Sequence, residues 1–205
     1  TSPGEKRNSK RMATVAAVYT IEPFRRTPEE IVADLRPVAD VAQRLKRPRP
    51  EGKRVWASLV QDPEQVIEQA FEEASRRDPR RTKRWVALVD GNKDQIRILR
   101  RTAKKHHVRL TIVLDLIHVL DYLWKAAWVF CPKASPEAEA WVTERFAEVL
   151  RGKASYVAGG VHRSATLRAM TSRQRKAADA CADYLLNYKQ LLRYDRYLSA
   201  GLPIA

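Results

Sequence analysis

The sequence contains few cysteines and glycines and no long apolar segment, and each shortage excludes a class of protein. Its 205 residues include two cysteines, Cys131 and Cys181, too few for a disulfide framework or a zinc site, so we expect the free thiols of a cytoplasmic protein. Seven glycines form no phosphate-binding loop, and there is no nucleophile elbow and no helical His-Glu-x-x-His pattern. No apolar run approaches a membrane span, and the first residues lack an apolar signal segment, so we expect no membrane partner.

Basic residues, in contrast, are abundant. Lys and Arg total 39 against 24 Asp and Glu, which gives a net charge of +15. Such an excess attracts polyanions and speeds their encounter with the protein, so nucleic acid is the first partner to consider. An arginine-rich composition without any polyanionic partner is the alternative.

The first half of the chain alternates between predicted strands and helices. Residues 1–11 are polar and predict a flexible basic arm. Apolar, β-branched runs predict strands at residues 12–21, 54–60, 85–89 and 108–114. Thr27 and Glu30 form a capping box for a first helix, Asp62 and Pro63 open a second, and Ile96, Leu99 and Ala103 mark the inner face of a third. Strand–helix–strand order implies parallel strand pairs with helices packed on the sheet.

After Asp115 the pattern becomes helical only. Helices are predicted at residues 116–130, from Pro136 to a stop at Gly152, at residues 164–170, and at residues 173–199 with a bend near Asn187. The sequence thus predicts an incomplete α/β core over residues 12–116 and a helical subdomain over residues 117–205.

Two of the four predicted strands end at an aspartate, Asp90 and Asp115. In open α/β sheets, chemistry gathers beyond the carboxyl ends of the strands. A carboxylate at Asp90 suits Mg²⁺, although an Asp-Gly pair is also typical of a turn. Asp115 and His118, three residues apart, can face one side of a helix and orient one ligand; alternatively Asp115 is the helix N-cap.

Two basic runs are candidate phosphate contacts, and their alternative is a solvated loop. The candidate DNA-binding residues are Lys46, Arg47, Arg49, Lys53, Arg54, Arg80, Arg81 and Lys83. Tyrosines interleaved with Lys and Arg near the end of the chain are also typical of a nucleic-acid surface, but helix packing is the interpretation that we favour for them. They are Tyr184, Tyr188, Tyr194 and Tyr197.

Several segments carry a family resemblance. Residues 85–92 (WVALVDGN) and 112–124 (IVLDLIHVLDYLW) resemble DDE-type transposases of bacterial insertion sequences. Residues 184–189 (YLLNYK), 193–198 (RYDRYL) and 201–204 (GLPI) are similar to the same family. The resemblance implies an RNase H-like α/β core interrupted by a helical insertion. It also implies metal-dependent DNA cleavage and strand transfer, with three carboxylates holding two Mg²⁺ ions.

The resemblance assigns roles to individual residues. Asp90 is similar to the second of the three carboxylates, which makes it the expected metal ligand; an alternative alignment gives that place to Asp115. Asp115 and His118 resemble the family's D-x-x-H pattern. The family's first aspartate lies on a strand just before residues 12–21, and its final glutamate lies beyond a Gly-x-Pro-Ile segment, here Gly201 to Ile204. This sequence shows neither, so we expect a fragment that binds DNA, holds Mg²⁺ weakly and is catalytically inactive alone.

Two other functions remain open. In the first, the chain is a non-enzymatic remnant that binds DNA or that pairs with itself or with an intact transposase. In the second, it is a Mg²⁺-dependent nuclease whose site is complete in a rearranged form. Without the family's first strand, the strand at residues 12–21 has an unpaired side, which predicts a marginal fold or one completed by another chain.

Overall fold

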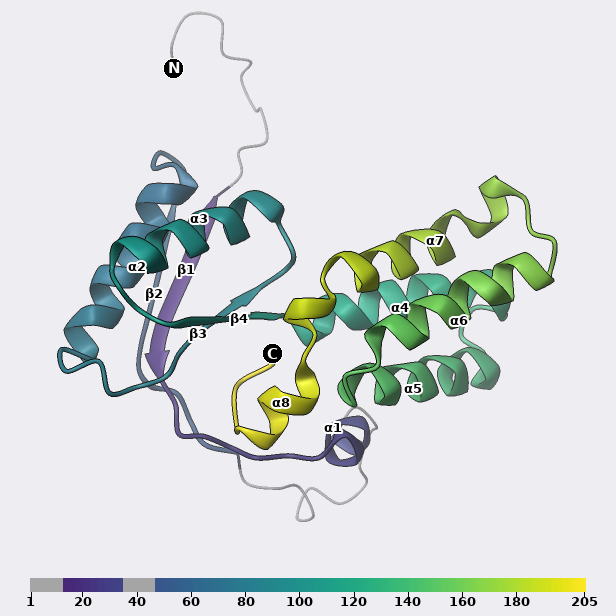
Figure 1. Cartoon of the computed structure of the whole chain (residues 1–205), viewed down its shortest axis with the longest axis horizontal. Coiled ribbons are helices and arrows are strands. Elements are labelled where there is room, and N and C mark those ends of the chain that lie inside the picture. The colour runs from purple at the N-terminus through teal and green to yellow at the C-terminus, as the bar shows by residue number, and fades with distance from the viewer. Residues whose placement is uncertain (1–12, 35–46) are drawn as a thin grey trace, which may run out of the picture. The chain divides into compact units, whose positions relative to one another are not determined.

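The computed structural model describes residues 13–34 and 47–205, and within them the protein is a mixed α/β structure with two small sheets (Figure 1). Residues 1–12, with the predicted basic arm, and residues 35–46, with Lys46, lie outside the described residues. The chain divides into two compact units. Of the described residues, the first unit contains 13–22, 49–85 and 93–110, and the second contains 23–34, 47–48, 86–92 and 111–205. The predicted boundary after residue 116 does not coincide with this division, because the second pair of strands belongs with the helices.

The sheet of the first unit joins β1 (Thr14–Thr20) to β2 (Glu51–Ser58). The two strands are antiparallel, with Val15 opposite Ala57 and Ala17 opposite Val55. The predicted parallel pairing is therefore wrong here. The helix between the two strands, α1 (Pro28–Asp34), is not a crossover helix on this sheet; it belongs to the second unit, where it packs against α5 (Pro136–Leu150). β2 also begins three residues before the predicted strand, within the basic run.

Two helices complete the first unit. The helix α2 (Pro63–Arg77) begins after Asp62, as predicted, and the structure adds a capping box in which the side chain of Asp62 accepts a hydrogen bond from the backbone N–H of Gln65. It packs against β1 and against α3 (Lys93–Lys105) and buries Phe71, which lies against the rings of Trp85 and His106. The segment after α2 is fixed by Asp78, a carboxylate that accepts three hydrogen bonds from backbone and indole N–H groups and one from a hydroxyl. The carboxylate of Asp78 can be buried because these hydrogen bonds satisfy its oxygens.

The second sheet pairs β3 (Trp85–Val89) with β4 (Leu110–Leu114), and the two strands are parallel. The structure confirms the predicted bounds of β3, and β4 begins two residues later than predicted. Past the end of β4, the backbone N–H of Asp115 donates to the carbonyl of Val89 at 2.8 Å. This bond aligns the ends of the two strands, so that each strand is followed at once by an aspartate.

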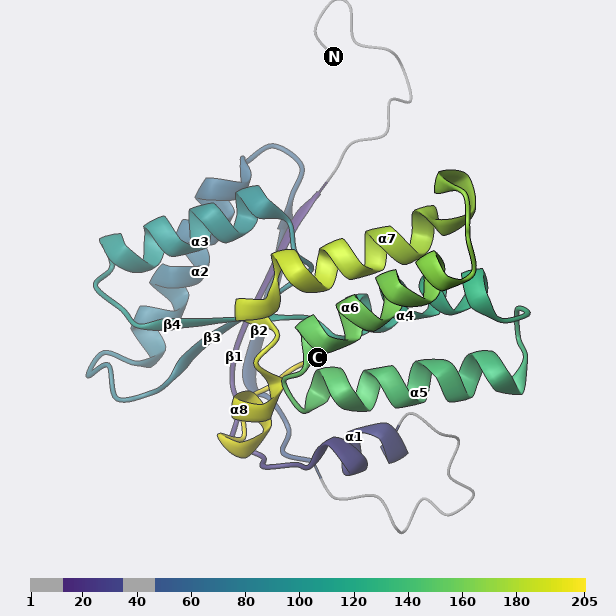
Figure 2. The same ribbon diagram turned by 45° about the vertical axis from the view of Figure 1, so that its right-hand side comes forward.

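Four long helices form the body of the second unit (Figures 1 and 2). They are α4 (Leu116–Phe130), α5, α6 (Ala154–Leu167) and α7 (Ser172–Asn187). α4 contacts α5 and α7, and α6 contacts α7. Small residues such as Ala126, Ala158 and Ala182 are fully buried where these helices meet. α4 has its predicted bounds, and α5 ends before Gly152, which adopts the left-handed conformation of a helix stop (φ +79°).

The helical prediction was wrong in two places. α6 begins ten residues earlier than predicted. The sequence does not mark this start, because the helix has no side-chain cap there and contains Gly159 and Gly160. The long helix predicted over residues 173–199 is instead α7, a 3₁₀ turn (Lys189–Leu191) and α8 (Tyr194–Ser199). Among the described residues, we find no helix that is both long and apolar enough to cross a membrane.

Candidate functional site

The two aspartates singled out in the sequence stand at the same edge of the second sheet. Asp90 follows β3 and Asp115 follows β4, and the bond from Asp115 N–H to the Val89 carbonyl sets their register. Asp90 is exposed and Asp115 is partly exposed. Two carboxylates that reach solvent from adjacent parallel strands form an acidic edge at the place where α/β sheets usually carry their ligands. This sheet edge is the candidate site.

Each aspartate also has a local structural role, as the alternative interpretations predicted. Oδ1 of Asp90 accepts from the backbone N–H of Asn92 at 2.9 Å, which closes a turn. Oδ1 of Asp115 accepts from the backbone N–H of Ile117 at 2.9 Å, which caps α4. These hydrogen bonds use Oδ1 and do not involve Oδ2. A turn at Asp90 and a helix cap at Asp115 therefore orient the two carboxylates.

The residue types of the edge fit a magnesium ion in part. Mg²⁺ prefers oxygen ligands and is commonly held by one or two carboxylates together with waters and the phosphates of a substrate. Within residues 13–34 and 47–205, no three His, Cys, Asp or Glu side chains are grouped so that they could hold a metal ion. Asp90 and Asp115 thus supply donors of the right kind for an ion that is also bound by phosphate.

His118 lies in the first turn of α4, three residues after Asp115, and its side chain is exposed. No hydrogen bond or ion pair joins it to Asp115 in the part of the chain that the structure describes. The prediction that the two residues share one helix face follows from their spacing. The structure adds that the imidazole is open to solvent and the carboxylate caps the helix.

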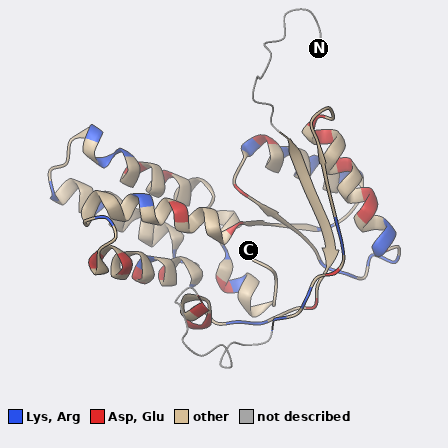
Figure 3. Cartoon of the chain, turned by 180° about the vertical axis from the view of Figure 1, so that it is seen from behind, with Lys and Arg blue, Asp and Glu red and all other residues tan. Residues whose placement is uncertain are grey.

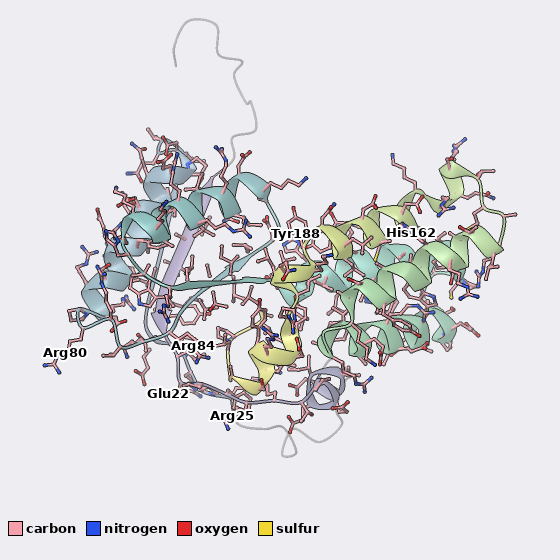
Figure 4. All side chains as sticks on the ribbon, viewed as in Figure 1. Glu22, Arg25, Arg80, Arg84, His162 and Tyr188 are labelled. Atoms are coloured by element: carbon pink, nitrogen blue, oxygen red, sulfur yellow. The ribbon has the colours of Figure 1, made fainter. Side chains whose placement is uncertain are left out.

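Tyrosines from the end of the chain hold this edge in place. The hydroxyl of Tyr184 donates to the carbonyl of Asp90 at 3.2 Å, and that of Tyr188 donates to the carbonyl of Gly91 at 2.5 Å. Figure 4 labels Tyr188 at the carboxyl end of α7. Tyr122 of α4 stacks on Tyr184 with 4.0 Å between ring centroids. We call Tyr122, Tyr184 and Tyr188 the tyrosine clamp.

Two further tyrosines bind the backbone of β4. The hydroxyl of Tyr194, which is fully buried, donates to the carbonyl of Leu114 at 2.8 Å, and that of Tyr197 donates to the carbonyl of Ile112 at 3.5 Å. Burial raises the pKa of Tyr184, Tyr188 and Tyr194 above the ordinary value of a phenol. The phenols therefore stay protonated and keep donating well above neutral pH.

The packing role favoured from the sequence thus agrees with the structure, but the sequence did not show what these tyrosines touch. A sequence signal for these contacts would be a set of tyrosines at helical spacing together with a glycine after a strand, where a side chain must pack closely against the backbone. Gly91 has φ +100°, and a Cβ on it would lie 3.2 Å from Cε2 of Tyr184. Only glycine combines this backbone conformation with so close a neighbour.

The predicted DNA-binding residues are dispersed over both units. In the first unit, Lys53 and Arg54 lie on β2, and Arg80, Arg81 and Lys83 lie in the exposed connection after α2 (Figures 3 and 4). Arg49 precedes β2 and is exposed, Arg47 belongs to the second unit, and Lys46 is outside the described residues.

Several of these cations already have partners. Arg54 donates to Glu73 at 2.8 Å, Arg47 pairs with Asp34, and Arg81 donates to the carbonyl of His107 at 3.2 Å. Hydrogen bonds from Arg76 and then Arg77, opposed by burial and helped by Arg54, lower the pKa of Glu73 to about 2. A guanidinium held by a carboxylate is less free to bind phosphate, so the basic runs are weaker candidates than their charge suggests.

Comparisons of the chain with protein families, with curated proteins and with solved structures give no match.

Proposed function

We propose that this chain is part of the catalytic region of a DDE-type, RNase H-like DNA transposase, which cleaves and joins DNA phosphodiesters with Mg²⁺. The observation that carries the proposal is the placement of Asp90 and Asp115 at the ends of adjacent parallel strands. Both aspartates lie within segments that resemble the family, and each directly follows a strand. The charge of +15 suits a DNA substrate.

In this proposal Asp90 and Asp115 share the metal, with the tyrosine clamp fixing the Asp90 backbone. When bound, Mg²⁺ would stabilise charge on the phosphate oxygens and lower the pKa of an attacking water. The turn at Asp90 and the cap at Asp115 hold the two carboxylates before metal arrives. The exposed imidazole of His118 can exchange hydrogen bonds with a phosphate or water held at the same edge.

The segment that resembles the family's Gly-x-Pro-Ile also lies at this edge. The backbone N–H of Leu116 donates to the carbonyl of Ile204 at 2.9 Å, so the Gly201–Ile204 segment lies beside Asp115. In the family a glutamate follows such a segment, and a residue in that position would lie near the acidic edge.

The proposal is tested by locating the metal. In a titration of the ¹⁵N-labelled chain with Mn²⁺ as a paramagnetic substitute for Mg²⁺, the first amide signals to broaden should be those of residues 90–92 and 115–117. Asp90→Asn and Asp115→Asn keep the size of the side chain and an oxygen acceptor for the turn and the cap, but they remove the charge. Each should abolish the early broadening at both segments.

Asp62→Asn is the matched control, because Asp62 is also an exposed helix N-cap but lies at α2. It should leave the broadening at residues 90–92 and 115–117 unchanged. The proposal is contradicted if broadening begins elsewhere, or if it persists in both Asp90→Asn and Asp115→Asn. Nicking of supercoiled plasmid that requires Mg²⁺ and is lost in Asp90→Asn would favour a nuclease complete within these 205 residues.

A further inference from the structure

One stretch of the second unit contains basic residues and no acidic residue of its own. Residues 149–178 contain seven Lys or Arg and no Asp or Glu: Arg151, Lys153, Arg163, Arg168, Arg173, Arg175 and Lys176. Five of these lie in the last two turns of α6, the connection, and the first two turns of α7: Arg163, Arg168, Arg173, Arg175 and Lys176. Arg175 pairs with Asp179, and we call the other four the tip cations. Figure 3 shows basic residues where α6 meets α7.

The tip cations are exposed and come from two helices that pack against each other and from the connection between them. Within the part of the chain that the structure describes, no ion pair involves any of the four. Four other exposed cations do have carboxylate partners: Arg97 pairs with Asp94, Arg101 with Glu64, Lys125 with Asp121 and Lys153 with Glu148. The positive field at the tip is therefore open to an external anion.

The tip cations also oppose the stability of the helix that carries two of them. α7 has no acidic residue in its first turn and instead places Arg173, Arg175 and Lys176 within its first five residues. Cations at a helix N-terminus are unfavourable, because the N-terminal end of the helix dipole is positive. A bound phosphate would reverse this unfavourable effect, since a helix N-terminus with basic neighbours attracts anions.

The connection holds these side chains on a rigid base. Thr171 and Gln174 form a capping box at the start of α7, and Nη1 of Arg175 donates to the hydroxyl of Thr166 at 3.4 Å. Arg168 donates to the carbonyl of Phe130 at 2.9 Å and lies over the Phe130 ring at 5.0 Å. These two contacts hold the guanidinium of Arg168 at the surface, and its planar fork of N–H donors is the kind of group that binds phosphate.

The outer face of α6 is shaped for a close neighbour. Tyr156, Gly159, Gly160, Arg163 and Leu167 follow one another at helical spacing on the side opposite the buried face. Tyr156 is 73% exposed and Leu167 76% exposed, and a Cβ on either glycine would meet nothing within 4 Å. Glycine inside a helix is less stable than alanine, and among the described residues no atom lies close enough to require glycine at either position.

We propose that the outer face of α6 and the tip cations together bind the phosphate backbone of duplex DNA. The glycine pair lets the DNA backbone approach the helix closely, and the tip cations contact successive phosphates. This surface is separate from the basic runs of residues 46–54 and 80–83 and from the acidic edge. Only the choice of DNA as the polyanion rests on the function proposed above.

The test is a salt titration of DNA binding by the full chain. Fluorescence anisotropy of a labelled 20-base-pair duplex of arbitrary sequence is recorded from 50 to 200 mM KCl with EDTA. A variant with Arg163, Arg168, Arg173 and Lys176 all changed to Gln is compared with a control in which Arg97, Arg101, Lys125 and Lys153 are changed to Gln. Both variants lose four charges, but the control cations already have carboxylate partners.

The tip variant should bind more weakly, and the slope of log affinity against log salt should flatten by about 3.6, since each of the four phosphate contacts contributes about 0.9. The control variant should change the slope by less than about 1. Equal slopes in the two variants, or no change in either, would overturn the proposal. Circular dichroism spectra and melting curves establish that both variants are folded.

A single substitution tests the surface without removing any cation. Gly160→Glu adds a negative charge in open space on the outer face of α6 and should weaken binding several-fold relative to Gly160→Gln. Ala140→Glu, on the exposed side of α5, adds the same charge elsewhere and should weaken binding less. Equal losses for the two glutamates would sink the proposal. Because EDTA removes divalent metal, these results are independent of the Mn²⁺ test at Asp90 and Asp115.

Discussion

Gly91 is the residue at which a one-carbon change should disturb the acidic edge most. Gly91→Ala places a Cβ at φ +100°, a conformation that costs a non-glycine residue about 1–3 kcal/mol. The same Cβ lies 3.2 Å from Cε2 and 3.3 Å from the hydroxyl of Tyr184, so the ring must shift. That shift weakens the bond to the Asp90 carbonyl, a loss of about 0.5–1.5 kcal/mol.

Together these effects predict that Gly91→Ala lowers the free energy of unfolding by about 2–4 kcal/mol. The measurement is urea denaturation followed by circular dichroism, in which the midpoint should fall by about 1 M or more. Gly160→Ala is the matched control, since it adds the same carbon inside a helix with open space around it, and it should raise stability by about 0.5–1 kcal/mol. If Gly91→Ala is as stable as Gly160→Ala, the clamp does not constrain the edge.

Three further predictions concern stability. Tyr194→Phe removes a fully buried hydrogen bond to Leu114 and should cost about 0.5–1.5 kcal/mol in urea denaturation; an unchanged midpoint would show that the bond contributes nothing. Glu73→Gln should destabilise the protein at neutral pH, because hydrogen bonds from Arg76 and its neighbours favour the carboxylate. The difference from wild type should shrink as pH falls from about 4.5 through about 2, and melting curves across this range would refute it by staying parallel. Thr171→Ala removes the cap of α7 and should cost about 1 kcal/mol, whereas Thr171→Ser should retain most of the stability.

Much of the element order could be predicted from local chemistry. Asp62 and Pro63, and Ser135 before Pro136, are start signals that act within one helical turn, and both helices begin where these residues predict. The strand at 85–89 was predicted with its bounds because apolar residues end there at an Asp-Gly pair. Signals of this kind need no knowledge of the rest of the fold.

The errors have tertiary causes. α6 has no side-chain cap and two internal glycines, and it is helical because Val157, Val161 and Ala165 are buried in the bundle. The antiparallel pairing of β1 with β2 was missed because the helix between them was taken to be a crossover, although α1 packs in the other unit. Local pattern does not reveal which surface a helix will cover.

The two aspartates of the candidate site could be predicted from the sequence, whereas the tyrosines that hold them in place could not. Asp90 and Asp115 were identifiable because each follows a strand, and parallel strands place such residues at one edge. The tyrosine clamp was not identifiable, since the contact from Tyr184 to Asp90 spans 94 positions in the sequence. Whether the edge holds metal and whether the chain binds DNA stay predictions with the tests given above.

The distance in sequence between Asp90 and Tyr184 has a consequence for how the protein is synthesised. Synthesis proceeds at about 5–20 residues per second, so the aspartate after β3 emerges several seconds before the tyrosine that fixes its carbonyl. The early parts of the chain can order while the acidic edge still lacks its support. A nascent polypeptide halted before α7 would therefore carry both aspartates in an edge without the hydrogen bonds from Tyr184 and Tyr188.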